Sequence, residues 1–427
     1  MDPSALSLDS HSAPVDTGGD PGTRPLLTNR HAMARMRLDL SWESGVARHR
    51  DTLVATKLNL WRDLFPPELE ADLLDRPRGH VATHRFDPGE LVTPWREGLH
   101  TQVRSGQFNR RFTGQGHVQP RAGRFYPRSI FRDLGGVFQS DRHPCRLTQV
   151  GGEHIRVDFN HPLAERPLEL AVTVEDIWSQ GVERGGRCNE ISALATADGP
   201  GMQARWRDLP TDFWSDQPFL RRDPRPDPEF YREPRFVDHI DRTAIAQIGA
   251  FYGRLIPAGA RILDLMSSWH SHLPESLTNG TVVGLGLNEA ELAENPVLTQ
   301  RHVQDINAEP TLHFADGSFD AVVCTVSVEY LTDPFAVFRE VARVLRPGGA
   351  FAVTFSNRWF PPKAIQLWEG IHEFERPGLV LEYFLESGLY RDLETWSLRG
   401  LPRPEDDKYA DRLVHSDPIY AVWATRS

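Results

Sequence analysis

Residues 316–355, DGSFDAVVCTVSVEYLTDPFAVFREVARVLRPGGAFAVTF, contain the pattern that decides the fold. Apolar runs at 319–326 and 350–355 are typical of buried strands. Between them, residues 334–345 predict a helix with Asp333 as its N-cap and proline at its first position. The apolar residues of this helix fall on one face: Phe338, Val341, Ala342 and Leu345. A buried strand, an amphipathic helix and a second buried strand indicate a parallel β–α–β unit.

Three more predicted strands extend this unit into a sheet. They cover residues 261–266 (RILDLM), 281–287 (TVVGLGL) and 301–305, and a helical pattern at 243–255 precedes the first of them. Strands that are apolar throughout and alternate with helices are covered on both faces of a parallel sheet. Such a sheet binds its ligand beyond the carboxyl ends of its strands. The sequence therefore predicts an α/β, Rossmann-like fold with a mostly parallel sheet.

Residues 240–427 resemble a class I S-adenosylmethionine-dependent methyltransferase of type 11. The resemblance rests on the turn into the fourth strand at 316–323, on VSVEYL at 326–331, and on LRPGG at 345–349. It implies S-adenosylmethionine as the cofactor and methyl transfer to a small-molecule acceptor. The attacking atom, which is oxygen, nitrogen or sulfur, is left open, and no catalytic residue is identified.

The resemblance also implies which residues contact the cofactor near the first strand. Asp264 matches the acidic residue below the methionine moiety. The family's glycine-rich loop is replaced by MSSWHSH at 266–272, so a positive φ in this loop would be strained. Ser267 and Ser268 still offer hydroxyl and backbone N–H groups to a carboxylate.

Other implied contacts lie at the ends of the following strands. The acidic residue that would bind the ribose falls near Gly286 and is missing, so Asn288 and Glu289 are the nearest substitutes. Asp305 and Ile306 match the pair beside the adenine, although a lone Asp305 also suits a turn cap. The predicted cofactor contacts are Asp264, Met266, Ser267, Ser268, Asn288, Asp305, Ile306 and, at the mouth of the fourth strand, Ser327 and Glu329.

Two alternatives accompany this site. His270 and His272 beside Asp264 raise the alternative of a metal centre, but the sequence supplies no evident third ligand, so we predict no metal. A methyltransferase fold that no longer binds its cofactor is the other alternative.

The first half of the chain has a different character. Residues 50–180 resemble a SlyD-type FKBP prolyl isomerase, an α+β domain. The resemblance rests on VDFNHPLA at 157–164 and on ELVTPWREGL at 90–99, the latter similar to the stretch before the insert-in-flap subdomain. The predicted strands of this β-rich part lie at 52–60, 145–150, 154–159 and 168–174.

The function of the FKBP-like part is open at the sequence level. Prolyl isomerisation needs an apolar groove, and Trp95 stands where that family has a groove tyrosine. Leu170 stands where the last strand of the family has an aromatic residue. A working isomerase, a module that binds proline-containing peptides and a structural relic all remain as alternatives.

A proline-rich stretch separates the two halves. Residues 205–235 contain six prolines and the aromatic residues Phe213, Trp214, Phe219, Phe230 and Tyr231, which predict an extended linker docked by aromatic anchors. Tyr231 and Arg235 either reach the cofactor or serve only this docking. The predicted division is a disordered tail at 1–34, an FKBP-like domain at 35–185, a linker and docking segment at 186–239 and a methyltransferase-like domain at 240–427.

Composition excludes several classes of function. The formal net charge is −11, and only 3 of the 48 basic residues are lysine, which disfavours a basic face for nucleic acid. No apolar run approaches the length of a membrane span, and three separated cysteines form no disulfide framework. We expect a cytoplasmic, multidomain enzyme that transfers a methyl group. One alternative is a prolyl isomerase or folding helper whose methyltransferase fold is a non-catalytic scaffold. Another is a cofactor sensor without catalysis.

Overall fold

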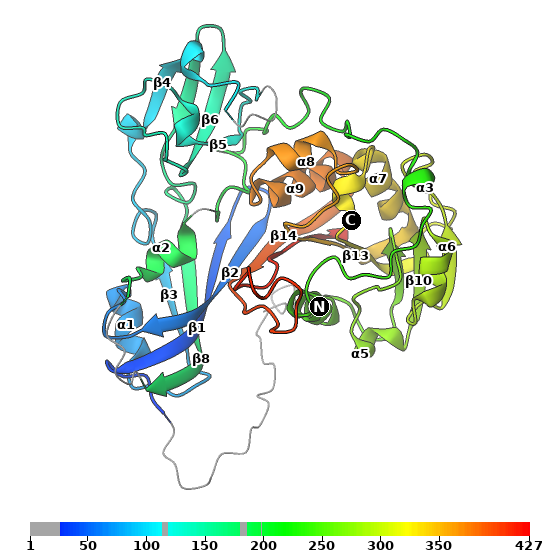
Figure 1. The fold of residues 1–427 in the computed structure, drawn as a ribbon, viewed down its shortest axis with the longest axis horizontal. Coiled ribbons are helices and arrows are strands. Elements are labelled where there is room, and N and C mark those ends of the chain that lie inside the picture. The colour runs from blue at the N-terminus through cyan, green and yellow to red at the C-terminus, as the bar shows by residue number, and fades with distance from the viewer. Residues whose placement is uncertain (1–25, 113–117, 180–185, 198) are drawn as a thin grey trace.

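The computed structural model describes residues 26–112, 118–179, 186–197 and 199–427. Within these ranges one large twisted sheet runs through both halves of the chain, and a small sheet stands apart at one end (Figure 1). In spatial order the large sheet comprises β11 (Gln300–Val303), β10 (Thr281–Gly286), β9 (Arg261–Leu265), β12 (Phe319–Thr325), β13 (Leu345–Phe355), β15 (Ile419–Arg426), β14 (Tyr390–Arg399), β2 (Arg48–Asn59), β1 (Ala32–Glu43), β8 (Leu168–Ser179) and β3 (Val81–Phe86).

The C-terminal part has the predicted Rossmann-like arrangement. Strands β11, β10, β9, β12 and β13 are parallel, in an order that reverses direction at β9. Helices cover both faces of this sheet (Figure 1). These helices are α4 (Arg242–Leu255), α5 (Glu275–Thr278), α6 (Glu289–Glu294), α7 (Pro334–Val344), α8 (Gln366–Gly370) and α9 (Glu375–Ser387). The predicted cap of α7 is confirmed, because the Asp333 carboxylate accepts a hydrogen bond from Ala336 N.

The two halves share one sheet across β2 and β14. These strands pair in parallel, with Trp396 opposite Arg50. The buried Asp51 carboxylate accepts hydrogen bonds from Trp42 Nε1 at 3.0 Å and from Ser397 Oγ at 2.8 Å. The predicted domains at 35–185 and 240–427 are therefore not separate sheets, because the second edge of β2 belongs to β14.

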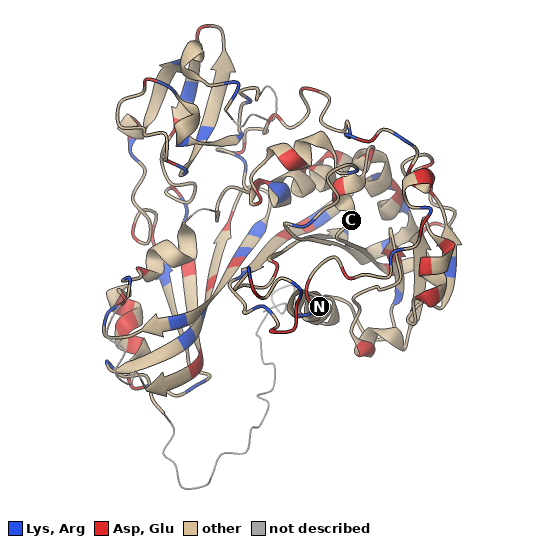
Figure 2. Cartoon of the chain, viewed as in Figure 1, with Lys and Arg blue, Asp and Glu red and all other residues tan. Residues whose placement is uncertain are grey.

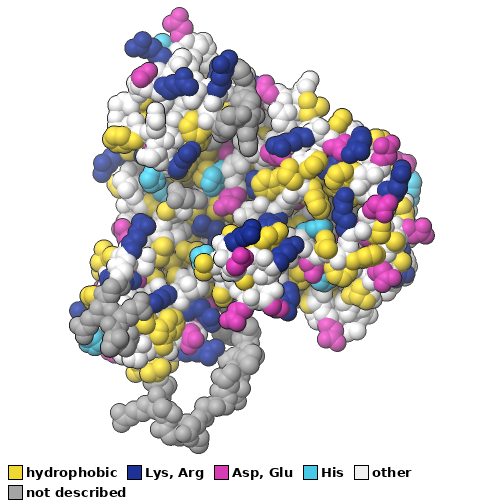
Figure 3. Space-filling view, viewed as in Figure 1, with side chains coloured by type: hydrophobic (Ala, Val, Ile, Leu, Met, Phe, Trp, Pro, Cys, Tyr) yellow, Lys and Arg dark blue, Asp and Glu magenta, His cyan; other side chains and the backbone are white. Residues whose placement is uncertain are grey.

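The N-terminal part contains the short helix α1 (Pro67–Leu73) and the small sheet. The small sheet is inserted between β3 and β8 and comprises β4 (His100–Arg104), β7 (His154–Asp158), β6 (Pro144–Gly151) and β5 (Phe125–Pro127). A groove between this sheet and residues 370–372 is lined by apolar residues and by the polar stretch 140–143. Figure 3 shows hydrophobic and charged side chains mixed over the visible face of the molecule. The predicted tail at 1–34 overlaps β1, which begins at Ala32, while residues 1–25 lie outside the described ranges.

The linker contains α2 (Ile191–Thr196), which packs against β1 and β2 of the N-terminal part, and α3 (Asp227–Phe230) (Figure 1). The aromatic residues between these two helices contact the C-terminal part. Trp214 stacks on Tyr383 with ring centroids 6.1 Å apart, and Phe219 meets Phe335 at 5.7 Å. Lys and Arg are spread over both parts, with Asp and Glu between them (Figure 2). None of the helices in the described ranges has the length and apolar character needed to cross a membrane.

Candidate functional site

A cleft lies at the carboxyl ends of β9, β10 and β12, the edge that the fold predicts for a ligand. It is a concave space, partly open to solvent and lined by apolar, polar and charged residues, which suits a small-molecule site. Eight of the nine predicted cofactor contacts line it, which leaves Glu329 as the exception. The eight are Asp264, Met266, Ser267, Ser268, Asn288, Asp305, Ile306 and Ser327.

Asp264 is a buried carboxylate at the floor of the cleft. Ser267 Oγ donates a hydrogen bond to its Oδ2 at 2.5 Å. Burial raises the pKa of Asp264 to about 6, and hydrogen bonds from Ser267 and Ser271 offset only part of that effect. A carboxylate that is removed from water in this way gains most from a cationic ligand.

The loop after β9 contains no glycine, and two features of the structure allow its backbone to approach the cleft. Met266 and His272 adopt left-handed φ values of +61° and +56°, so the expected strain is present in non-glycine residues. The close approach is made by Gly286 instead, since a Cβ on Gly286 would lie 2.1 Å from the carbonyl oxygen of Ser267. Ser267 N also donates to Leu285 O at 2.7 Å, which fixes the loop against the end of β10.

The same contact explains why no acidic residue stands at position 286. Of the predicted substitutes, Asn288 lines the cleft, but its side-chain amide donates to Tyr231 O at 2.9 Å and to Arg232 O at 3.1 Å. Its Oδ1 accepts a hydrogen bond from Glu291 N and caps α6. Asn288 therefore holds the linker in place, and its hydrogen-bonding groups are already used.

Glu291 is a cleft residue that the sequence interpretation missed. Its Oε1 accepts a hydrogen bond from Arg235 N and its Oε2 accepts one from Ser268 Oγ, both at 2.7 Å. The pattern Asn288-x-x-Glu291 is a signal for a helix start. The helix-start pattern places Glu291 in the first turn of α6. It does not show that Glu291 bonds the strap at Arg235 and the loop after β9 at Ser268.

Residues 227–239 of the linker pass over the cleft and will be called the strap (Figure 1). Asp227 anchors it through ion pairs with Arg221 at 2.7 Å and with Lys363 at 3.0 Å. Arg235 lies over the rings of Phe230 and Phe360, at 4.6 and 5.2 Å from their centroids. Its buried Nη1 has no hydrogen-bond partner among the described residues, so it remains available to an anion.

The predicted adenine pair and Ser327 also line the cleft. Asp305 Oδ1 accepts a hydrogen bond from Asn307 N at 3.0 Å, so Asp305 caps a turn in addition to facing the cleft. Ile306 is buried beside it. Val326, just before Ser327, has φ of +43°, a strained value for a β-branched residue. Strain of this kind concentrates at functional sites.

Glu329 does not lie where the resemblance implied. Its side chain is fully buried behind the cleft, and neither carboxylate oxygen has a donor from another described residue. Burial raises its pKa to about 8, which the Arg376 guanidinium only partly offsets. Glu329 therefore does not line the cleft and is not a cofactor contact in this arrangement.

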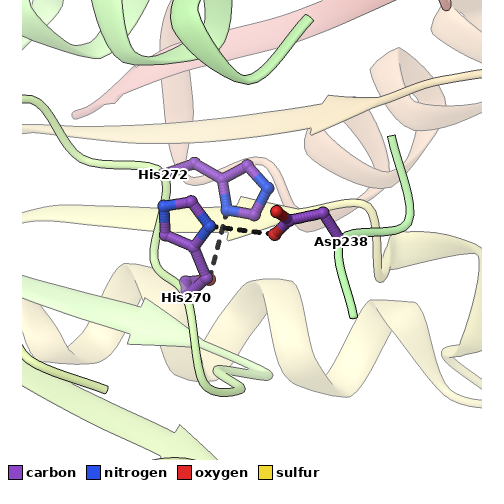
Figure 4. Close-up of side chains that lie close together, drawn as sticks. All are labelled: Asp238, His270 and His272. Carbon is purple, nitrogen blue, oxygen red and sulfur yellow. Dashed lines mark hydrogen bonds and ion pairs between the residues drawn. The ribbon is translucent and has the colours of Figure 1, made fainter. Parts of the chain in front are cut away.

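A second arrangement brings Asp238, His270 and His272 together (Figure 4). His270 Nδ1 lies 3.0 Å from Asp238 Oδ1, and the two imidazole rings stack with centroids 4.4 Å apart. Burial lowers the pKa of His272 to about 4, so this ring is neutral at pH 7. The strap thus adds a carboxylate, Asp238, that the sequence did not place beside the two imidazoles, and groups of these types can hold a divalent transition metal.

Comparison with known proteins supports the C-terminal assignment. Residues 267–353 match the family model described as a methyltransferase domain. A ubiquinone biosynthesis O-methyltransferase of Xanthomonas oryzae pv. oryzae is 34% identical over 120 residues, which cover 25% of this chain and 46% of that protein. Methyltransferase GfsG of Streptomyces halstedii is 30% identical over 137 residues, 29% of this chain and 48% of its own length.

Among solved structures, a SAM-dependent methyltransferase from Aquifex aeolicus is 16% identical, with a TM-score of 0.31 and coverage of 48% of this chain and 100% of its own. The chain spans about half the length of the curated relatives it matches. The C-terminal part thus contains a class I methyltransferase domain, for which S-adenosylmethionine is the methyl donor. Nothing in these comparisons supports the FKBP resemblance of residues 50–180, and the N-terminal part is β-rich without an identified family.

Proposed function

We propose that the protein transfers the methyl group of S-adenosylmethionine to a small-molecule acceptor. The observation that carries this proposal is the cleft at the carboxyl ends of β9, β10 and β12, which gathers eight of the nine predicted contacts. Its groups suit the cofactor's chemistry, because they combine a buried carboxylate, an unpaired guanidinium N–H and an apolar wall. The first curated relatives are O-methyltransferases by name, which favours oxygen as the attacking atom.

The residues of the cleft divide the binding among them. Asp264 attracts the ammonium group of the methionine moiety, and Arg235 Nη1 donates to its carboxylate. Asp305 accepts a hydrogen bond from the adenine amine, and Ile306 packs on the ring. When bound, S-adenosylmethionine supplies a methyl group on a positively charged sulfur. The strap lines part of the cleft, and catalysis by alignment of the reacting groups needs little acid–base help.

Calorimetry on the full chain tests the proposal with S-adenosylmethionine and its demethylated product as ligands. The full chain is required because the strap precedes residue 240 and contributes Tyr231, Arg235 and Asp238 to the cleft. We expect saturable binding and a rise in melting temperature. Absence of both heat and thermal shift at millimolar ligand would contradict the proposal.

Asp305→Ala is expected to weaken binding of the demethylated product by about 1–3 kcal/mol, because a charge-assisted hydrogen bond to the adenine amine is lost. Since Asp305 also caps a turn, Asp305→Asn serves as the matched control that keeps an acceptor for Asn307 N. Calorimetry on both folded variants separates the two roles. Equal affinity in Asp305→Ala and the wild type would place the adenine elsewhere.

The second candidate function is prolyl isomerisation by residues 50–180. One observation favours it: the small sheet is inserted between β3 and β8, directly after the stretch 90–99 that resembles the region before the insert-in-flap subdomain. Two observations argue against an open groove. Leu170 is fully buried in the large sheet, and the Arg207 guanidinium lies 5.1 Å from the Trp95 ring centroid.

We therefore expect the full chain to produce no more than a twofold acceleration of the proline-limited phase of refolding in a substrate protein. That phase otherwise takes tens of seconds. The measurement is the refolding rate with and without equimolar chain, with Trp95→Ala as the comparison variant. Strong acceleration that Trp95→Ala abolishes would make the folding helper the better proposal.

A further inference from the structure

Three side chains of the types that bind metal ions line the cleft together: Asp238, His270 and His272, called the triad below (Figure 4). One nitrogen of each imidazole and one carboxylate oxygen of Asp238 all lie within 4.8 Å of one another. Among the residues that the structure describes, no other group of three histidine, cysteine or acidic side chains is gathered so closely. The triad therefore concentrates the ligand types of a metal centre at one point of the molecule.

The separations within the triad suit a tetrahedral ion. Metal–ligand bonds of about 2.0–2.2 Å place neighbouring ligand atoms about 3.3–3.6 Å apart. His270 Nδ1 lies 3.0 Å from Asp238 Oδ1, and the ligand nitrogen of His272 lies within 4.8 Å of the ligand atoms of both. A shift of about 1 Å by one imidazole would therefore bring all three atoms to bonding distance.

His272 has a ring nitrogen that no described residue uses. Its Nδ1 lies 3.1 Å from the carbonyl oxygen of His270, which can only accept a hydrogen bond, so Nδ1 carries the proton. In the neutral ring Nε2 then presents a lone pair, and this atom is shielded from solvent without a hydrogen-bond partner among the described residues. Metal-binding histidines have the same arrangement, in which one nitrogen donates to a carbonyl and the other bonds the ion.

The ligand chemistry of the triad selects the class of ion. Two imidazoles and one carboxylate suit Zn²⁺ and other divalent transition metals. Mg²⁺ and Ca²⁺ prefer oxygen ligands alone, so the two imidazoles disfavour them. With three ligands from the protein, a tetrahedral ion keeps a fourth position for water.

The triad joins two segments of the chain that are distant in sequence. Asp238 lies near the end of the strap, while both imidazoles belong to the loop after β9. Beside the triad, Trp269 Nε1 donates a hydrogen bond to Val237 O at 3.2 Å. The other end of the strap is held by the ion pairs of Asp227. An ion in the triad would therefore hold the end of the strap that these ion pairs leave to hydrogen bonds.

We propose that the triad binds one divalent transition metal ion and that this ion fastens the strap to the loop after β9. The sequence alone supplied no third ligand beside the two histidines, and the strap provides it in Asp238. Neither metal binding nor fastening depends on methyl transfer. One consequence does rest on the proposed function: a fastened strap should tighten binding of the demethylated product, and the product should raise the affinity for the metal by the same factor.

Calorimetry with Zn²⁺ on the full chain, freed of metal by a chelator, tests the site. We expect one Zn²⁺ per chain that excess Mg²⁺ does not displace, and Co²⁺ in its place should show the intense visible absorption of a four-coordinate ion. Asp238→Ala and His270→Ala should each weaken Zn²⁺ binding about 100-fold. These side chains are 33% and 39% exposed, so neither replacement opens the core. The matched control is His143→Ala, because His143 pairs with Asp141 at 2.8 Å without a third ligand among the described residues.

Hydrogen exchange tests the fastening of the strap without any cofactor. Zn²⁺ should slow exchange of the backbone amides of residues 236–239 about tenfold in the wild type, because the metal closes a local opening of this segment. The same addition should leave the exchange of Asp238→Ala unchanged. Calorimetry with the demethylated product should then show about fivefold tighter binding when Zn²⁺ is present.

The outcomes separate the metal site from the proposed function. Undiminished Zn²⁺ binding by Asp238→Ala and His270→Ala, or displacement of the ion by Mg²⁺, would overturn the site. One bound Zn²⁺ that leaves exchange of the strap unchanged would overturn the fastening, and unchanged or weaker product binding would overturn the coupling. A chain that binds Zn²⁺ through the triad and slows exchange of the strap, yet binds neither S-adenosylmethionine nor its product, would support the metal site and refute the proposed function.

Discussion

Gly286→Ala is expected to abolish cofactor binding and to lower the free energy of unfolding by about 3 kcal/mol, as overpacking against a fixed group does. The added Cβ would lie 2.1 Å from the carbonyl oxygen of Ser267, a backbone atom that cannot rotate away. The hydrogen bond from Ser267 N to Leu285 O holds the loop against the end of β10, so either the loop or the strand end must move. Movement of this loop displaces the Ser267 hydroxyl from Asp264.

Urea denaturation and calorimetry with the demethylated product measure the two effects of Gly286→Ala. The matched control is Gly370→Ala in α8, where a Cβ would meet no atom within 4 Å. The control should bind like the wild type and show little loss of stability. Binding by Gly286→Ala within threefold of wild type would show that the contact between the loop and β10 does not shape the site.

The α/β core was predictable because its strands are unbroken apolar runs. Predicted strands at 261–266, 281–287 and 319–326 correspond to β9, β10 and β12, and α7 begins at its predicted proline. Local signals of this kind need no knowledge of distant residues. The sheet that joins both halves was not predictable, because β2 and β14 are separated by more than 300 residues and neither sequence specifies its partner.

The candidate site shows the same division. Asp264 lies within one predicted strand and Asp305 and Ile306 at the end of another, and the topology of a parallel sheet brings them to one cleft. Asp238 and Glu291 were missed because their positions depend on the path of the strap. Glu329 was assigned to the cofactor from its position after β12, whereas its side chain is fully buried and does not line the cleft.

Asp264→Asn is expected to stabilise the unliganded protein while it removes cofactor binding. In the folded chain burial raises the pKa of Asp264 from 3.8 to about 6, so the folded state favours the protonated carboxyl. The stability that this proton contributes is complete below pH 4 and is lost as pH rises through 6. Above that pH the ionised, buried carboxylate costs about 3 kcal/mol relative to the protonated form. A neutral asparagine avoids this cost and leaves an oxygen for Ser267 Oγ.

The free energy of unfolding of Asp264→Asn should therefore exceed that of the wild type by about 1–3 kcal/mol at pH 8, with the difference vanishing near pH 4. Product affinity, measured at pH 8, should fall at least tenfold, because an ionised carboxylate is what attracts the ligand's ammonium group. The contributions of other titrating groups cancel in this comparison, since both proteins contain them.

Ser267→Ala tests the opposite case: it removes a donor to the carboxylate and should lower the free energy of unfolding more at pH 8 than at pH 4. An Asp264→Asn variant that is less stable than the wild type at every pH would make Asp264 a structural residue. If Asp264→Asn instead raises the free energy of unfolding and weakens product binding, then the buried charge of Asp264 serves ligand binding and destabilises the unliganded fold.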